Sequence, residues 1–472
     1  MILAIDLGTT SWKAALFHRD GQLCHLSRIP TPVIQEEGEP CYDSGAVLAH
    51  LTLLLEQLPE DGRAHVSLVA LTGMAEAGLL VDRDSLRPLS NIWPWFDRRA
   101  VPTFRRLRED VRFRDRHGVT GLPDSYKYGI YKLLTLLERG TYDRDRILWM
   151  GLCAYACSLL CQSRTEDVSM AARTACVDIR SGRWDSGFLA SLGLSEACFP
   201  ELIAQGAIAG YLTRPICGLR AGTPVCLSGH DHVCAAYAAG ALQAHGIFLS
   251  TGTAQVVLTA SRDIRPGTGL SFGPCPTEAP YTCLGSIQSA GGSINYWKRL
   301  LFPGEDFAAL LREAEEAPSP SGLLYYPYLA GSGAPHLNPA ASGTLMGLRD
   351  STSRGAIIAG VYEGLAMETR YLTETMGVAP DARLYCMGGL TRHPRYLRTL
   401  SDVLGMTVAV PSLDEGTLYG AARLASARAG LTELPALQAD TVLTPNAAAH
   451  KTWTDFYRRR YLPMMNQTNM EE

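Results

Sequence analysis

The stretch Ser228–Thr253, SGHDHVCAAYAAGALQAHGIFLSTGT, places a carboxylate a short distance ahead of a glycine–threonine turn. Its first part predicts a helix that begins at Asp231, with small residues that allow close packing against a sheet. Its second part, 246–250, is apolar and predicts a buried strand that leads into Gly252 and Thr253. A base for a hydroxyl proton, near amides and hydroxyls for phosphate oxygens, suits phosphoryl transfer. The alternative is an aspartate that caps a helix, followed by an ordinary hairpin.

A similar hairpin opens the chain. Residues 1–23 predict an apolar strand, a turn and a second strand, and the turn carries amides and hydroxyls that could surround a phosphate. The carboxylate at the end of the first strand could hold Mg²⁺ through water. The stretch lacks the GxxxxGK[ST] pattern of a Walker loop, and a plain surface hairpin is the alternative. The residues concerned are Asp6, Thr9, Thr10, Ser11 and Lys13.

Residues 246–260 repeat this pattern of apolar strand, Gly-Thr turn and alternating strand. Two such hairpins, one opening each half of the chain, suggest an internal duplication with a nucleotide between the halves. A chain of 472 residues also exceeds what one hydrophobic core usually supports. We therefore expect domains at 1–224 and 225–462, joined through a Gly- and Pro-rich connection, with a short tail at 463–472.

Composition narrows the class of protein. With 46% hydrophobic and 19% charged residues, and a formal net charge of -4, the chain predicts an ordinary globular protein with no affinity for nucleic acid or anionic membrane. The 13 cysteines are scattered, and Cys153, Cys157 and Cys161 are favoured as small core residues over metal ligands. No apolar run approaches the roughly 20 residues of a membrane helix, and the apolar start is too short for a signal peptide. We expect a cytoplasmic protein.

Two further stretches indicate ligand binding. In 92–99, IWPWFDRR, tryptophans stand beside a carboxylate and guanidinium groups at the end of an expected strand, which suits the apolar face and hydroxyl edge of a sugar. In 384–410, a Gly388-Gly389 turn between a strand and a helix allows a flat ring or ribose to lie against bare backbone. A helix cap and a tight structural turn are the respective alternatives.

Taken in order, these features resemble the FGGY carbohydrate kinases over nearly the whole chain. None of the motifs is specific alone, but their order and spacing together are. They are Asp6–Thr10, Trp95–Arg99, Thr120–Pro123, Gly229–Asp231, Gly252-Thr253, Gly291–Trp297, Gly388-Gly389, Ser401–Gly405 and Tyr419–Ala422.

The resemblance implies an α/β chain with two domains of the actin-like, ribonuclease-H-like ATPase fold around a central cleft for ATP, Mg²⁺ and sugar. It makes Asp231 the general base and places Asp6 near the metal. Thr9, Thr10, Ser11, Lys13, Gly252 and Thr253 would approach the ATP phosphates, while Gly291, Asn295, Gly388, Gly389 and His393 would line the nucleoside pocket. Glu76, Trp95, Asp97, Lys127, His230, Asp231 and His232 would contact the substrate.

The chain also departs from the family pattern. Ala75 stands where glycerol kinases carry an arginine, Lys127 replaces a substrate-contacting tyrosine in an ungapped alignment, and His232 follows the base where Asn, Gln or a small polar residue is usual. These three departures argue against glycerol. Leu390 in place of a third glycine, and GSGAP at 331–335 in place of ERTP, leave the nucleotide contacts less defined.

His230 and His232 flank the expected base, and a pair of imidazoles spaced in this way can ligate a metal. Because no third ligand is evident nearby in sequence, we favour them as donors to sugar hydroxyls or as groups that orient Asp231.

The expected function is an ATP-dependent kinase that phosphorylates a hydroxyl of a ketose or polyol. A sugar-acid kinase, with Lys127 or Arg98 pairing a substrate carboxylate, is the rival. An actin- or chaperone-like ATPase module is a third reading, disfavoured because such modules need no carboxylate in a tryptophan-rich pocket. The expected partner is a small sugar or polyol. A homodimer is compatible with the sequence, which carries no signal that fixes the oligomeric state.

Overall fold

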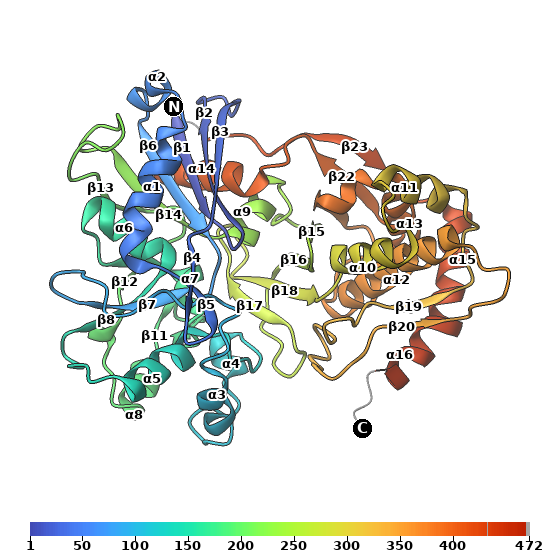
Figure 1. Ribbon diagram of the computed structural model, residues 1–472, viewed down its shortest axis with the longest axis horizontal. Coiled ribbons are helices and arrows are strands. Elements are labelled where there is room, and N and C mark those ends of the chain that lie inside the picture. Colours follow the sequence, from blue (N-terminus) through green and yellow to red (C-terminus); the bar gives the residue numbers. More distant parts are fainter. Residues whose placement is uncertain (432, 469–472) are drawn as a thin grey trace. The chain divides into compact units, whose positions relative to one another are not determined.

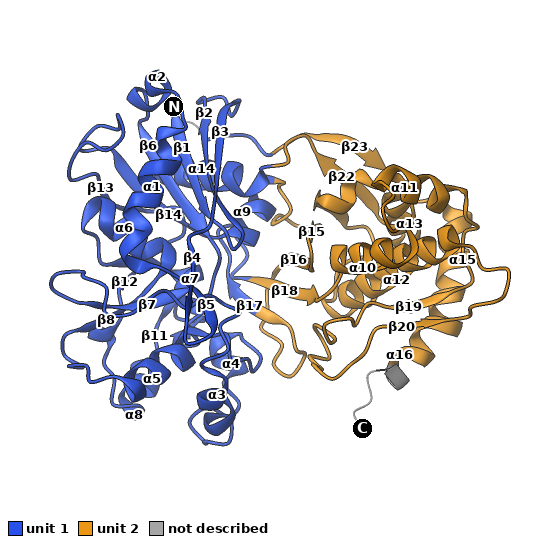
Figure 2. Cartoon of the chain, in the orientation of Figure 1, with its two compact units in different colours: residues 1–238, 272–281, 415–436 blue, residues 239–271, 282–414, 437–472 orange. Residues whose placement is uncertain are grey.

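The computed structural model describes residues 1–431 and 433–468 (Figure 1). They form two compact units, coloured separately in Figure 2: unit 1 comprises residues 1–238, 272–281 and 415–436, and unit 2 comprises 239–271, 282–414 and 437–472. This division differs from the expected break at 224/225. The strand β14 (Pro224–His230) and the helix α9 (Asp231–Ala238) both belong to unit 1, so Asp231 lies there and not in the C-terminal half.

The central sheet of unit 1 has the strand order β13-β14-β6-β1-β2-β3. β1, β2 and β3 form an antiparallel meander, whereas β1, β6 and β14 run parallel. β1 and β6 are buried at every position. Because parallel strands in the middle of a sheet are covered on both faces, their sequences are mostly apolar without alternation. The bounds are β1 (Ile2–Leu7), β2 (Ser11–Phe17), β3 (Leu23–Pro30), β6 (Leu68–Gly73) and β13 (Ile208–Tyr211).

Shorter elements surround this sheet, and Figure 1 labels most of them. The strands are β4 (Val33–Glu36), β5 (Glu39–Tyr42), β7 (Gly78–Asp82), β8 (Ile147–Gly151), β9 (Thr165–Asp167), β10 (Val177–Asp178), β11 (Arg183–Trp184), β12 (Glu201–Ile203) and β17 (Ser271–Pro274). The helices are η1 (Ser44–Ala46), α1 (Val47–Glu56), α2 (Glu60–Ala64), α3 (Val101–Leu107), α4 (His117–Thr120), α5 (Gly129–Arg139), α6 (Leu152–Cys161), α7 (Val168–Ala172), α8 (Ser186–Ser191), η2 (Glu196–Cys198) and α14 (Gly416–Arg428).

Unit 2 repeats the strand order of unit 1. Its sheet runs β18-β16-β15-β21-β22-β23, with β15 antiparallel to β16 and parallel to β21, and β22 parallel to β21 and antiparallel to β23. The repeat that the two Gly-Thr hairpins suggested is therefore present in the topology. The strands are β15 (Gly246–Thr251), β16 (Gln255–Ser261), β18 (Tyr281–Ile287), β21 (Arg383–Gly388), β22 (Thr407–Pro411) and β23 (Ala439–Leu443), with a separate pair β19 (Leu324–Tyr326) and β20 (Thr344–Met346).

The helices of unit 2 include the longest one of the described chain, α12. They are α10 (Gly291–Leu301), α11 (Phe307–Glu316), α12 (Arg354–Thr375), η3 (Gly389–Arg392), α13 (Pro394–Leu404), α15 (Ala447–Phe456), the π-helical turn η4 (Tyr457–Tyr461) and α16 (Leu462–Thr468). The expected tail at 463–472 thus continues as helix to 468, and 469–472 lie outside the described residues.

Helix α9 packs on α14, which comes from a segment far along the chain. The contact is tight at Gly420, where an added Cβ would lie 1.8 Å from the carbonyl oxygen of Cys234. Arg423 of α14 also donates through Nη1 to the carbonyl oxygen of Tyr237 at 2.6 Å. The small residues after Asp231 therefore serve a close helix–helix contact as well as packing on the sheet.

One local expectation fails. The stretch 92–99 is not a strand, since only Ile92 and Trp93 make isolated β-bridges. The arginine-rich stretch 98–116 is helical only over α3 and otherwise forms turns. In the part of the chain that the structure describes, no helix combines the length and apolar character that crossing a bilayer requires.

Candidate active site

Three carboxylates lie at one edge of the unit 1 sheet. Asp6 is in register with Thr72 of β6, and Gly229 of β14 is in register with the same residue. Because β1, β6 and β14 are parallel, their carboxyl ends meet at one edge, which is where ligands bind in open α/β sheets. Asp6 at the end of β1, Glu76 after β6 and Asp231 after β14 are therefore neighbours.

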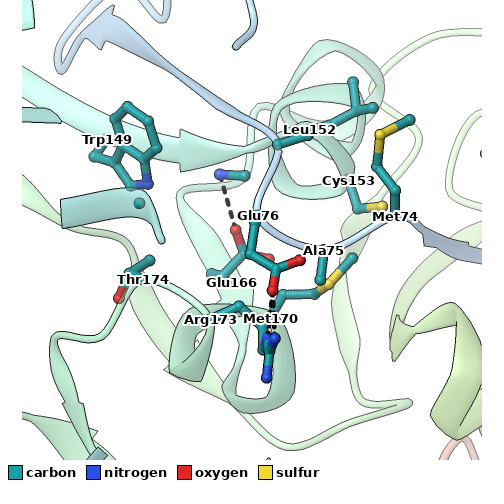
Figure 3. Close-up of a pocket in the computed structure, with 13 residues that line it drawn as sticks. Met74, Ala75, Glu76, Trp149, Leu152, Cys153, Glu166, Met170, Arg173 and Thr174 are labelled. Atoms are coloured by element: carbon teal, nitrogen blue, oxygen red, sulfur yellow. Dashed lines mark hydrogen bonds and ion pairs between the residues drawn. The ribbon is translucent and has the colours of Figure 1, made fainter. Parts of the chain in front are cut away.

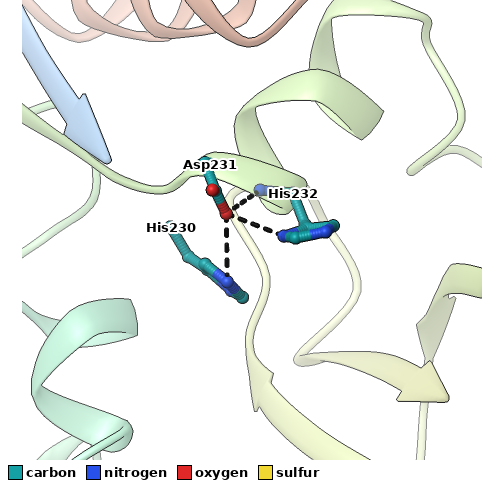
Figure 4. Close-up of side chains that lie close together, drawn as sticks. All are labelled: His230, Asp231 and His232. Carbon is teal, nitrogen blue, oxygen red and sulfur yellow. Dashed lines mark hydrogen bonds and ion pairs between the residues drawn. The ribbon is translucent and has the colours of Figure 1, made fainter. Parts of the chain in front are cut away.

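Asp231 is held by the two histidines beside it (Figure 4). His232 Nδ1 lies 2.7 Å and His230 Nε2 3.2 Å from Asp231 Oδ1, and the backbone amide of His232 donates to the same oxygen at 2.7 Å. Burial alone would raise the pKa of Asp231, but the charges and hydrogen bonds of the histidines lower it to about 2. Asp231 is thus ionised at neutral pH, with Oδ1 used for positioning and Oδ2 directed elsewhere.

Asp6 is a buried carboxylate whose Oδ1 has no hydrogen-bond partner among the described residues. Burial, and secondarily the negative charge of Asp231, raise its pKa to about 7. A divalent cation would satisfy the orphaned oxygen and offset the repulsion between the two carboxylates. The residues present therefore fit a Mg²⁺ ion next to Asp6.

This raised pKa predicts a pH dependence. Proton and cation compete for Asp6, so kcat/KM for Mg-ATP should fall as the pH drops below about 7, and higher free Mg²⁺ should move the break to lower pH. Profiles at two Mg²⁺ concentrations measure this effect, and Asp6→Asn should lack the shift. A break that stays in place at both concentrations would contradict it.

The same shift fixes a sign for stability. Between pH 3.8 and about 7 the folded protein holds a proton on Asp6 that the unfolded chain releases. The stabilising contribution of Asp6 to the free energy of unfolding is therefore fully present below pH 3.8. It is lost as the pH rises from there to about 7.

Glu76 forms an ion pair with Arg173, and both side chains are only 8% exposed. Arg173 Nε donates to Glu76 Oε1 at 2.8 Å, and Nη2 donates to the same oxygen. Burial opposes ionisation of Glu76, but the charges of Arg173 and Lys127 lower its pKa to about 2. Lys127 Nζ stays 3.7 Å from Glu76 Oε1 with 35% of its side chain exposed, so this ammonium group is only loosely engaged.

Lys132 of α5 holds the backbone that presents Glu76. Its Nζ donates to the carbonyl oxygens of Glu76 and, at 2.7 Å, of Pro94, although the side chain is fully buried. Burial lowers the pKa of Lys132 to about 7. Glu76 itself has a φ of 59°, a left-handed conformation that is costly for a residue with a Cβ and often marks a functional site. Lys132 thus ties a strained loop to the tryptophan segment.

A small cavity lies behind Glu76 and Arg173 (Figure 3). Its volume of about 20 Å³ accommodates one water molecule. Glu166 lines it and accepts from the Gly151 amide at 3.0 Å through Oε2, whereas Oε1 has no partner among the described residues. Burial raises the pKa of Glu166 well above its ordinary value, so this carboxyl is neutral and can donate a hydrogen bond.

The first Gly-Thr hairpin lies beside this cluster. Thr9 is half-buried and Thr10 exposed, and Trp95 Nε1 donates to Thr9 Oγ1 at 3.1 Å. Lys13 is ion-paired with Glu415 at 2.6 Å, and Glu415 immediately precedes α14. The hairpin thus carries hydroxyls for a phosphate together with a lysine that already has a counter-ion in unit 1.

Asp97 is not part of this cluster. Its side chain is fully buried, and its oxygens accept from Arg99, including Nη2 at 2.6 Å, while Arg99 also pairs with Glu36. Trp93 lies 4.1 Å from the guanidinium carbon of Arg99, measured to the ring centroid. The expected role of Asp97 as a substrate contact therefore rests on the family resemblance alone.

In unit 2, two glycine turns leave the same edge of the sheet. Thr251 of β15 is in register with Gly388 of β21, so the Gly252-Thr253 and Gly388-Gly389 turns are adjacent, and all four residues are exposed. Gly388 has a φ of 107°, and a Cβ there would lie 2.7 Å from the Thr251 carbonyl oxygen. These turns form an exposed edge of bare backbone that suits phosphate or ribose.

The start of α10 supports the second Gly-Thr turn. The amide of Gly291 donates to the Gly252 carbonyl oxygen at 3.0 Å, and those of Ala290 and Gly292 donate to Thr253 at 2.9 and 3.0 Å. Gly291 is needed because a Cβ would lie 2.6 Å from the Gly252 carbonyl oxygen. Three amides that could have faced a nucleotide are thus used inside unit 2, and Asn295 remains exposed on α10.

His393 lies at the N-terminus of α13, and its position differs from that of an exposed ligand contact. Its side chain is 8% exposed, and Nδ1 is hydrogen-bonded to the Tyr362 hydroxyl at 2.7 Å. Burial lowers its pKa, so the ring is neutral. It contributes to the packing of α12 against α13.

Comparison with known proteins assigns the family. The N-terminal domain of the FGGY family of carbohydrate kinases matches residues 1–238, and the C-terminal domain of the same family matches residues 247–429. The chain belongs to the FGGY carbohydrate kinases. As in that family, it is an ATP-dependent phosphotransferase with an alcohol group as acceptor, which removes the ATPase-module reading.

Individual relatives differ in acceptor. The chain is 28% identical over 465 residues to a glycerol kinase from Trichlorobacter lovleyi, covering 91% of this chain and 90% of the relative. Its fold is similar to that of a gluconate kinase from Lactobacillus acidophilus (TM-score 0.91, 21% identity, 100% and 98% of the two chains) and of a xylulose kinase from the same organism (TM-score 0.90, 21% identity, 99% and 98%). These structures confirm the predicted two-domain α/β fold.

Sequence reasoning missed several residues of the site. Arg173 has no acidic residue three or four positions away, and a lone cation of this kind is a signal that its partner is distant. Glu415, Lys132 and Glu166 carried no comparable signal, because their partners are backbone groups or residues far along the chain.

Proposed function

We propose that the protein transfers the γ-phosphoryl group of Mg-ATP to a hydroxyl of a ketose or polyol, with Asp231 as general base. The observation that carries this proposal is the meeting of Asp231, Asp6 and the Glu76–Arg173 pair at the carboxyl edge of the unit 1 sheet. Phosphoryl transfer depends mainly on positioning and on neutralising charge, and each of these groups supplies one of the two.

The roles follow from the geometry. Oδ2 of Asp231 takes the proton of the substrate hydroxyl. His230 and His232 hold the carboxylate in place through Oδ1. Glu76 Oε2, left open by the pair through Oε1, accepts from substrate hydroxyls. Asp6 would hold Mg²⁺, which would neutralise phosphate charge. Thr9 and Thr10, on the first hairpin of unit 1, would donate to phosphate oxygens.

A sugar acid is the second candidate, and the position of Lys127 supports it. Arg173 already pairs closely with Glu76, so the Lys127 ammonium group, 3.7 Å from Glu76 Oε1 and one-third exposed, is engaged only loosely. Such a group can pair with a substrate carboxylate. Ala75, which is buried, offers no donor at the position where glycerol kinases carry an arginine.

The test is a coupled ADP-release assay with Mg-ATP and a panel of ketoses, aldoses, polyols including glycerol, and aldonates. One acceptor that raises turnover far above the sugar-free background supports the kinase and names its class. Sugar-independent hydrolysis across the whole panel would contradict the proposal.

Lys127→Met separates the two candidates. For an aldonate, loss of a charge-assisted contact of about 1.5–3 kcal/mol should raise KM by about 10- to 100-fold. For a neutral ketose or polyol the change should stay below about threefold, because only a fraction of a kcal/mol is at stake. Lys298→Met, on α10 of unit 2, is the control and should alter neither value.

A further inference from the structure

The two histidines and the aspartate of the base form a compact set of metal-ligand atoms. One ligand atom from each of His230, Asp231 and His232 lies within 4.8 Å of the other two. We propose that these three side chains bind one divalent transition-metal ion of the zinc class. The ion would bind the Asp231 oxygen through which the histidines position the base, and it would thereby inhibit phosphoryl transfer. This inhibition rests on the proposed function, whereas the binding itself does not.

The distances fit such an ion. Zinc bonds of about 2.0–2.2 Å to nitrogen and oxygen in tetrahedral geometry place neighbouring ligand atoms about 3.3–3.5 Å apart. The two nitrogens lie 3.2 and 2.7 Å from Asp231 Oδ1, so the ligands need to move only slightly outward (Figure 4). The side chains are 12%, 25% and 31% exposed in chain order, which leaves the site reachable from solvent.

The backbone explains why three consecutive residues face one point. His230 ends β14 and Asp231 begins α9, so the chain changes direction between them. Gly229 has a φ of 92°, and a Cβ there would lie 2.5 Å from Ser169 Oγ, which keeps this turn tight. The sequence alone offered two histidines without a third ligand, and the strand-to-helix turn makes Asp231 that ligand.

The donor set selects the kind of metal. Two imidazoles and one carboxylate suit zinc and its neighbours, whereas Mg²⁺ prefers oxygen ligands in an octahedral shell. The set is therefore distinct in chemistry from the Mg²⁺ position at Asp6.

Binding can be measured directly on the full-length protein after removal of adventitious metal with a chelator. Zn²⁺ is titrated in competition with a chromophoric chelator in the presence of excess Mg²⁺, and Co²⁺ is titrated by visible absorbance. We expect one ion per chain, with cobalt bands of nitrogen and oxygen ligation. His230→Gln/His232→Gln should weaken Zn²⁺ binding at least about 100-fold, beyond the 10- to 100-fold typical when only a supporting residue is lost.

His65→Gln is the matched control, because His65 lies 3.6 Å from Asp61 as an exposed histidine–aspartate pair. It should bind Zn²⁺ as the unaltered protein does. Equal affinity in the double variant, or a thiolate charge-transfer band showing that cysteines hold the cobalt, would overturn the proposal.

A second measurement tests the consequence. Zn²⁺ should lower kcat of the unaltered protein at the same concentrations at which it binds. Full turnover with the site loaded would contradict the inhibitory role. A chain that binds Zn²⁺ but phosphorylates nothing would refute the proposed function and leave the metal site standing.

Discussion

Asp231→Asn is expected to lower kcat by at least about 10²-fold, the usual scale for a lost general base. The amide keeps the shape of the carboxylate but cannot take up the proton of the substrate hydroxyl. Binding of ATP and sugar should persist, because the phosphate turns and the Glu76–Arg173 pair are unaltered. Steady-state kinetics with a binding titration of each ligand measures the split between kcat and affinity.

The matched control is Asp306→Asn, which changes an aspartate that caps α11 by accepting from the Ala309 amide at 2.9 Å. Asn caps helices as well as Asp does, so this variant should retain its turnover. If Asp231→Asn also turned over almost normally, Asp231 would be no more than the first residue of α9.

Arg173→Met is expected to destabilise the protein by about 3–5 kcal/mol, because it leaves the Glu76 carboxylate buried without its main counter-charge. Glu76→Gln/Arg173→Met removes both charges and should recover most of that loss, since replacing a buried pair is often close to neutral. Denaturant and thermal midpoints of both variants report the effect. The double variant should still bind sugar poorly, because a neutral amide accepts hydrogen bonds from hydroxyls more weakly than a carboxylate does.

Arg112→Met provides the comparison, since Arg112 pairs with Asp110 on the surface at 2.6 Å. Its midpoint should match that of the unaltered protein, because exposed pairs are screened by water and salt. Equal stability losses in the single and double variants at Glu76–Arg173 would show that packing of the arginine matters and the ion pair does not.

Local patterns predicted the two Gly-Thr hairpins and the helix that starts at Asp231, because each depends on residues close in sequence. The duplication was visible only as two short similar stretches, yet it extends to the order of six strands in each sheet. The domain boundary was misplaced because α14, which completes unit 1, arrives from residues 416–428. No local pattern marks that return.

In the candidate active site, too, some features could be predicted from local sequence and others depend on residues far along the chain. Asp6, Glu76 and Asp231 each end or follow an apolar strand, so their convergence could be expected once the strands were taken as parallel. The burial of Asp97 in an ion pair with Arg99 could not be predicted, because its neighbours Trp95 and Phe96 suit the side of a sugar-binding pocket equally well. Lys132 acts through backbone carbonyls, which sequence patterns do not reveal.

The packing of α9 against α14 also bears on how the protein is made. During synthesis, residues 1–238 leave the ribosome long before residue 428, and at about 5–20 residues per second the interval is about 10–40 s. Through that time the nascent chain lacks α14, which packs on α9 at Gly420. It also lacks Glu415, which forms the ion pair with Lys13. Unit 1 of this kinase is thus completed late in translation, and a message cut short after residue 238 would yield an incomplete unit 1.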